Sequence, residues 1–307
     1  MSVRWIALAA LVLLVPSSGA AQSGGWRQAA PARDPRSEVA AAAVNGEIVI
    51  VGGFRQVGAN SRRVDAFSPT RNRWRRLPDL PLAVDHSTAA AYRGRLYVSG
   101  GYRSDRSRSN QAFVFARGRW SRLPRMPSPR AAAGAAFVGA KLYVVGGVGP
   151  NGLARNGLVY DPRRRRWRTI PGPTPREHLG VTAARGRVFV VAGRTAGFDT
   201  NLDLVEAYSP STGRWETVPP VPGTRGGTGA AASGRYVVSA GGEAQPGTVK
   251  EVYALDLDTN RWRRLPDLPT PRHGLGVAYA NGRVYVVAGG PTPGLSVSPA
   301  NEFLPLR

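Results

Sequence analysis

The chain has 307 residues, enough for one large domain or two ordinary ones, and its 42% apolar content argues against a disordered protein. With 38 glycines, 26 prolines and no cysteine, it is not typical of a helical bundle and cannot form a disulfide framework or a thiolate metal site. The 42 lysines and arginines outnumber the 19 acidic residues, and the net charge of +23 predicts a surface that attracts anions.

The first predicted element is a signal peptide at residues 1–21. A basic start precedes an eleven-residue apolar run, Trp5–Val15, and small residues follow in Pro16–Gln22. Such a run is too short to cross a hydrocarbon core about 30 Å thick, so we expect cleavage after Ala20 or Ala21 and no transmembrane segment in the mature chain. The protein is therefore expected to be exported, to the periplasm or the extracellular space.

A period of 46 to 48 residues runs through the rest of the chain. Its clearest marker is a short turn between two β-type runs, and successive turns are 48, 46, 46, 48 and 48 residues apart. The second residues of these turns are Gly46, Gly94, Ala140, Gly186, Gly234 and Gly282. Each turn predicts a β-hairpin, and a period of this length is typical of propellers and solenoids.

Two further strands complete each repeat. A third run, such as VDAFSP at residues 64–69, follows each of the six hairpins, the last being NEFLPL at residues 301–306, and after the first five a tryptophan opens a fourth strand. These tryptophans, spaced by 46, 47, 48 and 47 residues, are Trp74, Trp120, Trp167, Trp215 and Trp262. Four strands per repeat make a propeller blade, and we expect the tryptophans to pack between neighbouring blades.

The two ends of the chain are expected to form the sixth blade together. The sixth hairpin has no tryptophan strand after it, whereas Trp26 precedes the first hairpin without one of its own. The segment around Trp26 is therefore expected to supply the fourth strand of the sixth blade, which closes the ring and removes exposed sheet edges. The predicted fold is an all-β, six-bladed propeller of four antiparallel strands per blade. It occupies residues 22–307, with blades at about 32–78, 80–124, 128–171, 174–219, 222–266 and 269–307 plus 23–30.

These repeats resemble kelch repeats over essentially the whole mature chain. The resemblance rests on the aromatic residue of the third strand, the tryptophan followed by a Leu/Ile/Val-Pro pair, and a double glycine after the second strand. The double glycines and their near equivalents are Gly52-Gly53, Gly100-Gly101, Gly146-Gly147, Ala192-Gly193, Ala240-Gly241 and Ala288-Gly289. The resemblance implies a β-propeller, and many propellers of this kind only bind partners.

The entry to strand one and the exit from strand two meet at one end of each blade, and this mouth is the candidate ligand site. Five blades bring an arginine there: Arg36, Arg130, Arg176, Arg225 and Arg272. Guanidinium groups match carboxylate, sulfate and phosphate. The resemblance implies that such arginines capture acidic peptides, together with aromatics at Phe54 and Tyr102. The other interpretation, that each arginine is structural and pairs with backbone or an acid, stays open.

The three histidines, His86, His178 and His273, fall near the start of strand one in alternate blades, where they could converge on a metal ion. However, His273 lies nine residues before its turn and the others lie eight, and a one-residue offset reverses the direction of a strand side chain. We therefore predict no metal and no cofactor, and assign His86 and His178 to the ligand-binding mouth.

The resemblance to kelch repeats brings in two enzymes that carry such propellers, and they define the catalytic alternatives. The copper-radical chemistry of galactose oxidase needs a cysteine, which this chain lacks. N-acetylneuraminate epimerase, an exported six-bladed kelch propeller that acts on an acidic sugar, stays the alternative. Candidate acid/base groups are Glu38, His86, Glu177, His178 and Glu243. Spacing does not select among them, so no catalytic residue is assigned.

Arginine runs beside the tryptophan strands, such as Arg163–Arg166, predict a basic rim. Such a rim either binds polyanions or keeps an exposed strand edge from pairing. Nucleic acid is not an expected partner of an exported protein. The sequence thus predicts a monomeric, non-enzymatic binding module for an anionic partner: an acidic protein segment, an acidic glycan or envelope polymer, or a small acidic ligand.

Overall fold

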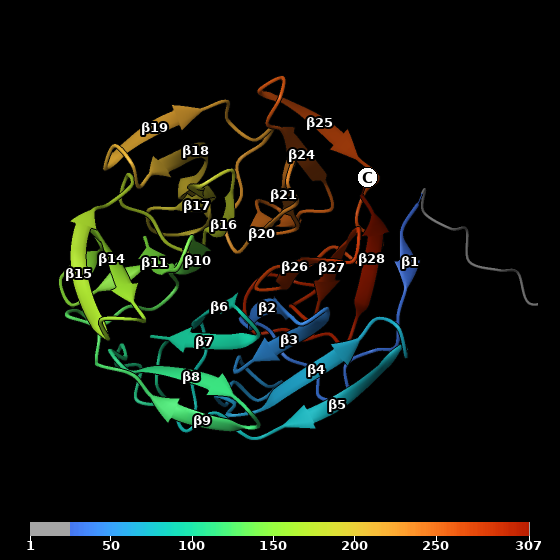
Figure 1. Ribbon diagram of the computed structural model, residues 1–307. Coiled ribbons are helices and arrows are strands. Elements are labelled where there is room, and N and C mark those ends of the chain that lie inside the picture. The colour runs from blue at the N-terminus through green and yellow to red at the C-terminus, as the bar shows by residue number, and fades with distance from the viewer. Residues whose placement is uncertain (1–24, 307) are drawn as a thin grey trace, which may run out of the picture.

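Each repeat folds into a four-stranded antiparallel sheet, in which apolar runs such as β3 are buried between neighbouring sheets, and six such sheets surround a central axis (Figure 1). This computed structural model describes residues 25–306. The predicted signal peptide, residues 1–21, lies outside them. Within the described range the one helical element is the 3-10 turn η1 (Phe198–Thr200), and no helix there is long and apolar enough to cross a membrane. The predicted six-bladed propeller is confirmed.

Strands run from the axis to the rim within each blade, and the first three blades follow chain order. Blade 1 consists of β2 (Ala40–Val44), β3 (Glu47–Val51), β4 (Val64–Ser68) and β5 (Arg73–Leu77). Blade 2 consists of β6 (Thr88–Tyr92), β7 (Arg95–Ser99), β8 (Ala112–Ala116) and β9 (Arg119–Arg122). Blade 3 consists of β10 (Gly134–Val138), β11 (Lys141–Val145), β14 (Asn156–Asp161) and β15 (Arg166–Pro171).

The remaining blades repeat this order, except that the last one takes its outer strand from the other end of the chain. Blade 4 consists of β16 (Gly180–Ala184), β17 (Arg187–Arg194), β18 (Asn201–Ser209) and β19 (Arg214–Val218). Blade 5 consists of β20 (Gly229–Ala232), β21 (Tyr236–Ala240), β24 (Val252–Asp256) and β25 (Arg261–Leu265). Blade 6 consists of β26 (Gly276–Ala280), β27 (Arg283–Val287), β28 (Asn301–Pro305) and β1 (Arg27–Gln28). Two loops carry short hairpins, β12 (Val148–Gly149) with β13 (Gly152–Leu153), and β22 (Glu243–Ala244) with β23 (Gly247–Thr248).

Ring closure occurs as the sequence predicts. Strand β1 pairs antiparallel with β28, with Arg27 opposite Phe303. The preceding Trp26 is buried, and its indole N–H donates to the carbonyl of Pro266 in blade 5 at 2.8 Å. The first described strand therefore joins the last blade (Figure 1), and blade 6 has four strands like the others.

The core lies between the blades. Six apolar clusters form, one at each junction between neighbouring blades; at the junction of blades 6 and 1, for example, Tyr285 packs with Phe67 and Trp74. Each outer-strand tryptophan also donates its indole N–H to a carbonyl of the preceding blade at 2.7–3.0 Å. The pairs are Trp74–Ala30, Trp120–Pro78, Trp167–Pro124, Trp215–Pro171, Trp262–Pro219 and Trp26–Pro266. The predicted packing of the tryptophans between blades is confirmed, and it explains why a Leu/Ile/Val-Pro pair follows most of them.

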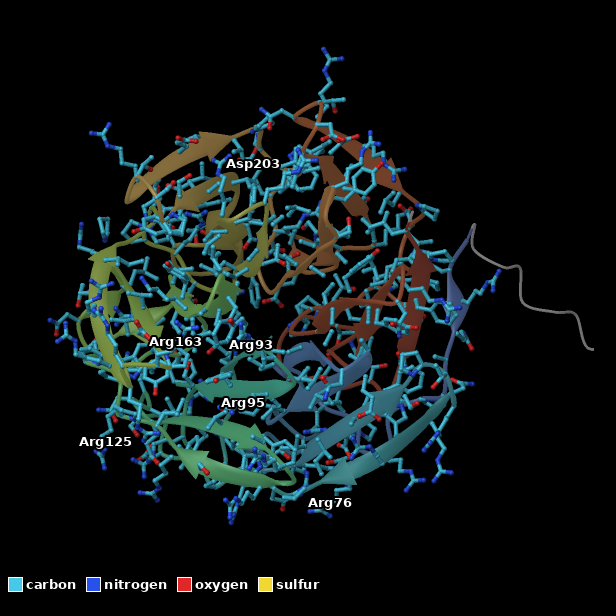
Figure 2. The ribbon with its side chains drawn as sticks, in the orientation of Figure 1. Arg76, Arg93, Arg95, Arg125, Arg163 and Asp203 are labelled. Carbon is cyan, nitrogen blue, oxygen red and sulfur yellow. The ribbon has the colours of Figure 1, made fainter. Side chains whose placement is uncertain are left out.

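The two surfaces of the ring differ in composition. The innermost strands are rich in alanine and line a narrow axial channel, because only small side chains fit where six strands crowd together. The outermost strands alternate buried and exposed residues, and their exposed positions carry arginines such as Arg76. Figure 2 shows arginine side chains, among them Arg76 and Arg125, at the periphery of the ring. Charge along these edge strands opposes pairing with another sheet.

Candidate functional site

The mouth lies where the sequence places it. Residues just before strand one bridge to residues just after strand two, as in Ser37–Phe54 of blade 1 and Asp85–Tyr102 of blade 2. Equivalent bridges occur in the four other blades, including Glu177–Arg194 in blade 4. Loops that enter strand one and leave strand two therefore meet around the axis at one end of the channel.

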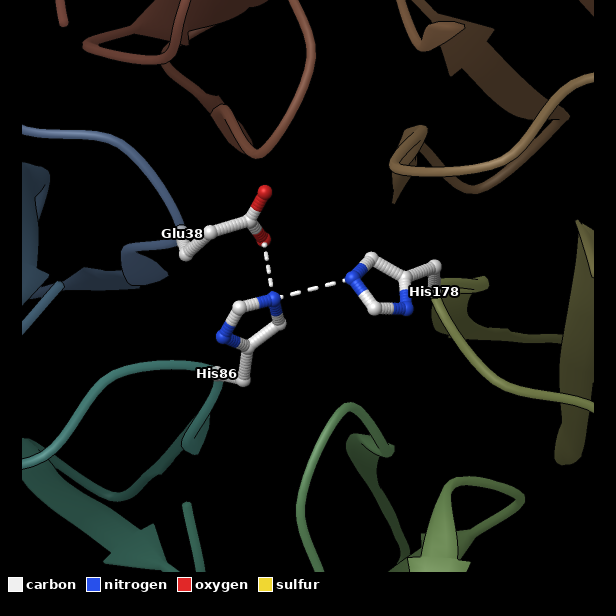
Figure 3. A group of neighbouring side chains, drawn as sticks. All are labelled: Glu38, His86 and His178. Atoms are coloured by element: carbon white, nitrogen blue, oxygen red, sulfur yellow. Dashed lines mark hydrogen bonds and ion pairs between the residues drawn. The ribbon is translucent and has the colours of Figure 1, made fainter. Parts of the chain in front are cut away.

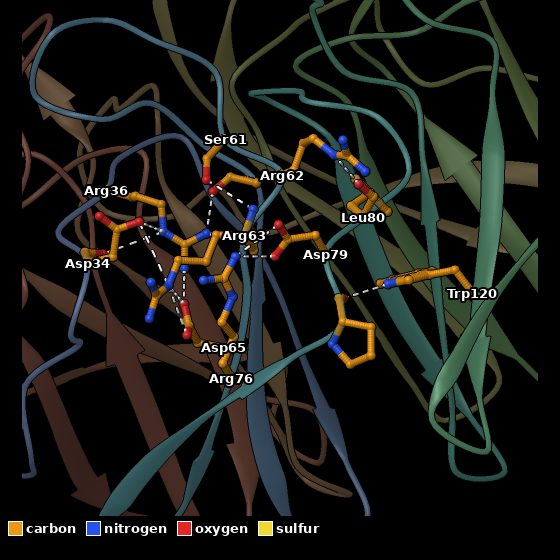
Figure 4. A network of polar contacts seen from close by, with 12 residues as sticks. Asp34, Arg36, Ser61, Arg62, Arg63, Asp65, Arg76, Asp79, Leu80 and Trp120 are labelled. Carbon is orange, nitrogen blue, oxygen red and sulfur yellow. Dashed lines mark hydrogen bonds and ion pairs between the residues drawn. The ribbon is translucent and has the colours of Figure 1, made fainter.

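The five candidate arginines lie in the walls of this mouth rather than on its surface. Arg36 is fully buried and donates to the carbonyls of Gly52 and Arg63, both at 2.8 Å, and to Asp65 on β4 at 2.6 Å (Figure 4). Arg176 and Arg272 are equally buried, and each pairs with an acid on the third strand of its own blade, Glu206 and Glu302 respectively. In these three blades the guanidinium ties the second and third strands to the loop before strand one.

The other two arginines are held without an acid on the third strand. Arg130 contacts the backbone and side-chain oxygens of Asn156, while Arg225 donates to the carbonyl of Glu251 at 2.9 Å and lies over the ring of Tyr253. All five side chains are at most 2% exposed. The structural interpretation, left open by the sequence, accounts for these contacts, and a ligand-binding role for the arginines stays a prediction.

A ring of six residues surrounds the axis at the mouth, and we call it the mouth ring. Its members occupy the same position in each blade and all have a positive φ of 50–59°: Glu38, His86, Ala132, His178, Gly227 and Gly274. The N–H of each member in blades 2 to 6 donates to the carbonyl of the member in the preceding blade at 2.8–3.1 Å. Val39 closes the ring by donating to the carbonyl of Gly274 at 3.3 Å. This conformation costs glycine little but strains the other residue types.

Three mouth-ring side chains meet on the axis, and we call them the axial cluster: Glu38, His86 and His178 (Figure 3). The Nε2 atom of His86 lies 2.9 Å from Nε2 of His178 and 3.1 Å from Oε2 of Glu38. Their side chains are 8–12% exposed. Imidazole and carboxylate groups from three different blades therefore share one small volume at the end of the channel.

Charged groups of neighbouring residues support this cluster from outside. The Nδ1 atom of His86 bonds to Asp85, and Nδ1 of His178 lies 3.2 Å from Oε1 of Glu177. His273, which precedes the mouth-ring residue of blade 6, does not reach the axis; its Nδ1 lies 3.1 Å from Oε1 of Glu38. The predicted offset of His273 from the other two histidines is confirmed.

The protonation states follow from these neighbours. Burial opposes ionisation of Glu38, but the histidines, His86 foremost, outweigh it and hold the pKa of Glu38 well below its usual range. Burial also opposes a charge on His86, but Glu38 and Asp85 outweigh it and raise the pKa of His86. Burial lowers the pKa of His178. The neighbouring groups thus favour the ionised form of Glu38 and the protonated form of His86, whereas burial favours the neutral form of His178.

The predicted aromatic residues flank the axial cluster. Phe54 and Tyr102 pack edge-on against the ring of His86, with centroids 5.7 and 5.6 Å away. Arg106, in the loop between β7 and β8, covers both, with its guanidinium carbon 4.4 Å from the centroid of Tyr102 and 5.5 Å from that of Phe54. It also pairs with Asp85 at 3.2 Å and stays half-exposed. The structure therefore brings Phe54, Tyr102 and His86 together under an accessible cation.

Comparison with known proteins identifies the family. Residues 38–225, more than half of the chain, match the family described as the KLHDC2/KLHL20/DRC7 Kelch-repeats domain, and residues 224–269 match the kelch motif. The chain belongs to the kelch-repeat family. Human (Homo sapiens) Kelch-like protein 33 is 36% identical to this kelch propeller over 77 residues, which are 25% of this chain and 14% of that protein. Kelch propellers are generally protein-interaction modules, and neither comparison supports the epimerase alternative.

Sequence reasoning missed two features of this kelch propeller. It did not notice that Glu38, like His86 and His178, lies eight residues before its hairpin turn, which places all three in one register. It also overlooked the acids Asp65, Glu206 and Glu302, which follow their arginines by 29 or 30 residues. Both signals are visible in the alignment of the repeats.

Proposed function

We propose that this kelch propeller is an interaction module that binds an acidic protein segment on its mouth face. The observation that supports this is the distribution of exposed apolar side chains. Within residues 25–306, the large apolar side chains that are exposed are Val57, Phe198 and Leu295, at 86%, 37% and 65%. All three lie in loops between the second and third strands, on the mouth face. The loops of Val57 and Leu295 lie against each other, since a Cβ atom at Gly58 would be 3.5 Å from Leu295, and exposed apolar side chains that adjoin in this way are typical of a docking surface.

Exposed arginines stand next to these apolar groups, although Arg55 and Arg106 each also pair with an acid of the chain, Asp34 and Asp85 respectively. Arg55 is exposed beside Val57 in the loop between β3 and β4, while Arg103 and Arg106 are exposed in the neighbouring loop of blade 2. Their guanidinium groups can donate to carboxylates of a partner. The combination favours a protein segment with acidic and apolar side chains over a purely charged glycan or polymer.

The exposed arginines, rather than the buried ones, are therefore the residues that would bind the carboxylates of a partner. The guanidinium groups of Arg36, Arg176 and Arg272 are saturated by carbonyls and carboxylates within their own blades. A ligand that recruited them would have to break those bonds. Arg106 needs no such rearrangement, because Tyr102 and Asp85 already hold it at the surface with donors to spare.

A labelled peptide that alternates glutamate and leucine is a direct probe of this face. We expect binding that weakens with salt, and we expect Arg106→Gln to raise the dissociation constant about tenfold, because one charge-assisted contact of about 1–2 kcal/mol is lost. Fluorescence anisotropy measures both effects. The same peptide with glutamine in place of glutamate should bind far more weakly.

Arg93→Gln is the matched control. Arg93 is exposed in the hairpin turn at the opposite end of blade 2 and, like Arg106, has a positive φ, 49° against 60°. The two substitutions thus remove the same charge from similar backbone conformations on opposite faces. Equal affinities of the two variants, or equal binding of the glutamine peptide, would exclude the mouth face as an acid-binding surface.

We also propose that the protein works after export, in the periplasm or the extracellular space. The support is the sequence of residues 1–21, with its apolar run and small residues. In native cells, protein recovered outside the cytoplasm is expected to begin at Ala21 or Gln22. N-terminal mass spectrometry checks this, and an uncleaved chain confined to the cytoplasm would contradict it.

A further inference from the structure

We propose that the axial cluster of Glu38, His86 and His178 binds a first-row divalent metal ion, and that Zn²⁺ fits its donors best. This site is independent of the partner-docking surface proposed above. Two imidazoles and one carboxylate form a common set of zinc ligands. Here they come from blades 1, 2 and 4 and converge on the propeller axis (Figure 3).

The spacing of the donor atoms suits one ion. Nε2 of His86 lies 2.9 Å from Nε2 of His178 and 3.1 Å from Oε2 of Glu38, and all three donor atoms lie within 4.8 Å of one another. Ligands that bind zinc at 2.0–2.1 Å in a tetrahedron are about 3.3 Å apart. Small outward shifts of the side chains would therefore accommodate the metal ion.

The outer groups orient each donor in the way metal ligands are usually oriented. Nδ1 of His86 is hydrogen-bonded to Asp85, and Nδ1 of His178 lies 3.2 Å from Oε1 of Glu177 without a hydrogen bond, which leaves both Nε2 atoms for the metal. Oε1 of Glu38 lies 3.1 Å from Nδ1 of His273, which leaves Oε2 free to coordinate. Carboxylates behind histidine ligands fix the tautomer and increase the basicity of the coordinating nitrogen.

The fold itself does not require these three side chains. The mouth ring continues through Ala132, Gly227 and Gly274 with the same positive φ and the same backbone hydrogen bonds. Ala132 bears the same backbone strain, so what distinguishes Glu38, His86 and His178 is that their polar side chains are largely buried at the axis without serving ring closure. A bound cation would compensate for that burial, because the converging donor atoms would coordinate it.

The small residues on the other side of the ring leave space for the site. A Cβ atom at Gly274 would clash with the carboxylate of Glu38, so the glycine leaves room for this carboxylate beside the axis. With three protein ligands, a tetrahedral ion keeps one position for water or a partner group, as in open zinc sites. This assignment departs from the sequence-based expectation of no metal, because that expectation rested on His273 as the third donor.

The test uses protein without a polyhistidine tag, treated with a chelator and then titrated with Zn²⁺ by calorimetry. We expect one equivalent to bind. Because the chain has three histidines, long-range ¹H–¹⁵N spectra of the wild-type protein are simple to assign. Coordination should shift the Nε2 resonances of His86 and His178 but leave Nε2 of His273 bonded to the carbonyl of Thr292. Unchanged histidine resonances in the presence of Zn²⁺ would overturn the proposal.

Variants separate the roles of the residues. His178→Ala copies the residue that blade 3 has at this ring position, and we expect it to weaken Zn²⁺ binding at least about 100-fold. Glu177→Gln should weaken it about 10- to 100-fold, as the loss of an outer carboxylate does. Ala132→Ser, which alters the ring but removes no donor, should bind Zn²⁺ like the wild type. Equal Zn²⁺ affinity of His178→Ala and Ala132→Ser would exclude the site. If a variant does not fold, the histidine resonances of the wild-type protein still show whether Zn²⁺ binds to His86 and His178.

Discussion

Replacement of Arg272 by methionine is expected to lower the free energy of unfolding by about 3–5 kcal/mol, because it leaves Glu302 buried without its cation. Arg272 is fully buried and donates to Glu302 and to the carbonyl of Thr270 at 2.6 Å, and to the carbonyls of Ala288 and Val286 at 2.7 and 2.9 Å. Glu302, Val286 and Ala288 are buried, so these three acceptors cannot reach water in the folded blade without rearrangement. Urea denaturation of the variant and the wild type measures the loss.

Blade 2 supplies the control for this experiment. At the positions of the arginine and its acid it has Val84 and Phe113, both buried in the cluster between blades 1 and 2. The fold thus accepts an apolar pair in place of the ion pair, and Arg272→Val combined with Glu302→Phe should recover most of the lost stability.

The same variants distinguish the two interpretations of the mouth arginines. A structural arginine predicts a large loss of stability in the single variant and recovery in the double variant. A ligand-binding arginine predicts that both variants stay stable and lose affinity for the acidic peptide. A single variant as stable as the wild type would therefore contradict the structural interpretation.

The fold could be predicted because the same sequence pattern occurs six times. Each hairpin turn has a weak signal alone, but six turns at nearly constant spacing leave few architectures. The unmatched Trp26 then showed how the ring closes, since a propeller without that strand would have a three-stranded last blade. Neither inference needed the direction of any side chain.

The site was harder because it depends on side-chain direction. Sequence spacing placed Arg272 at the mouth correctly, but could not show that its guanidinium turns away from the axis toward β28. At the mouth ring, sequence spacing failed to predict a side chain that does point toward the axis. The residues of this ring have a positive φ, so the alternation of a regular strand does not apply to them, and Glu38 turns toward the axis beside His86 and His178.

Replacement of Trp26 by alanine is expected to lower the free energy of unfolding by about 3–5 kcal/mol and to open blade 6 locally. Trp26 is buried with Leu265, Leu304 and other apolar residues at the junction of blades 5 and 6, and its N–H is bonded to Pro266. Urea denaturation gives the global loss. Native-state hydrogen exchange of the β26–β28 amides reports the local opening.

The expected difference from other tryptophans follows from connectivity. Trp120 makes the same indole bond to the preceding blade, but its strand β9 continues directly from β8 through a short turn. Strand β1 has no such link to its sheet; it is paired with β28 alone, while its chain leads on into blade 1. Trp120→Ala should therefore leave exchange in blade 6 unchanged, whereas Trp26→Ala should accelerate it before global unfolding. Exchange that rises only with global unfolding in both variants would mean that ring closure does not depend on the Trp26 contact, and that the backbone pairing of β1 with β28 suffices.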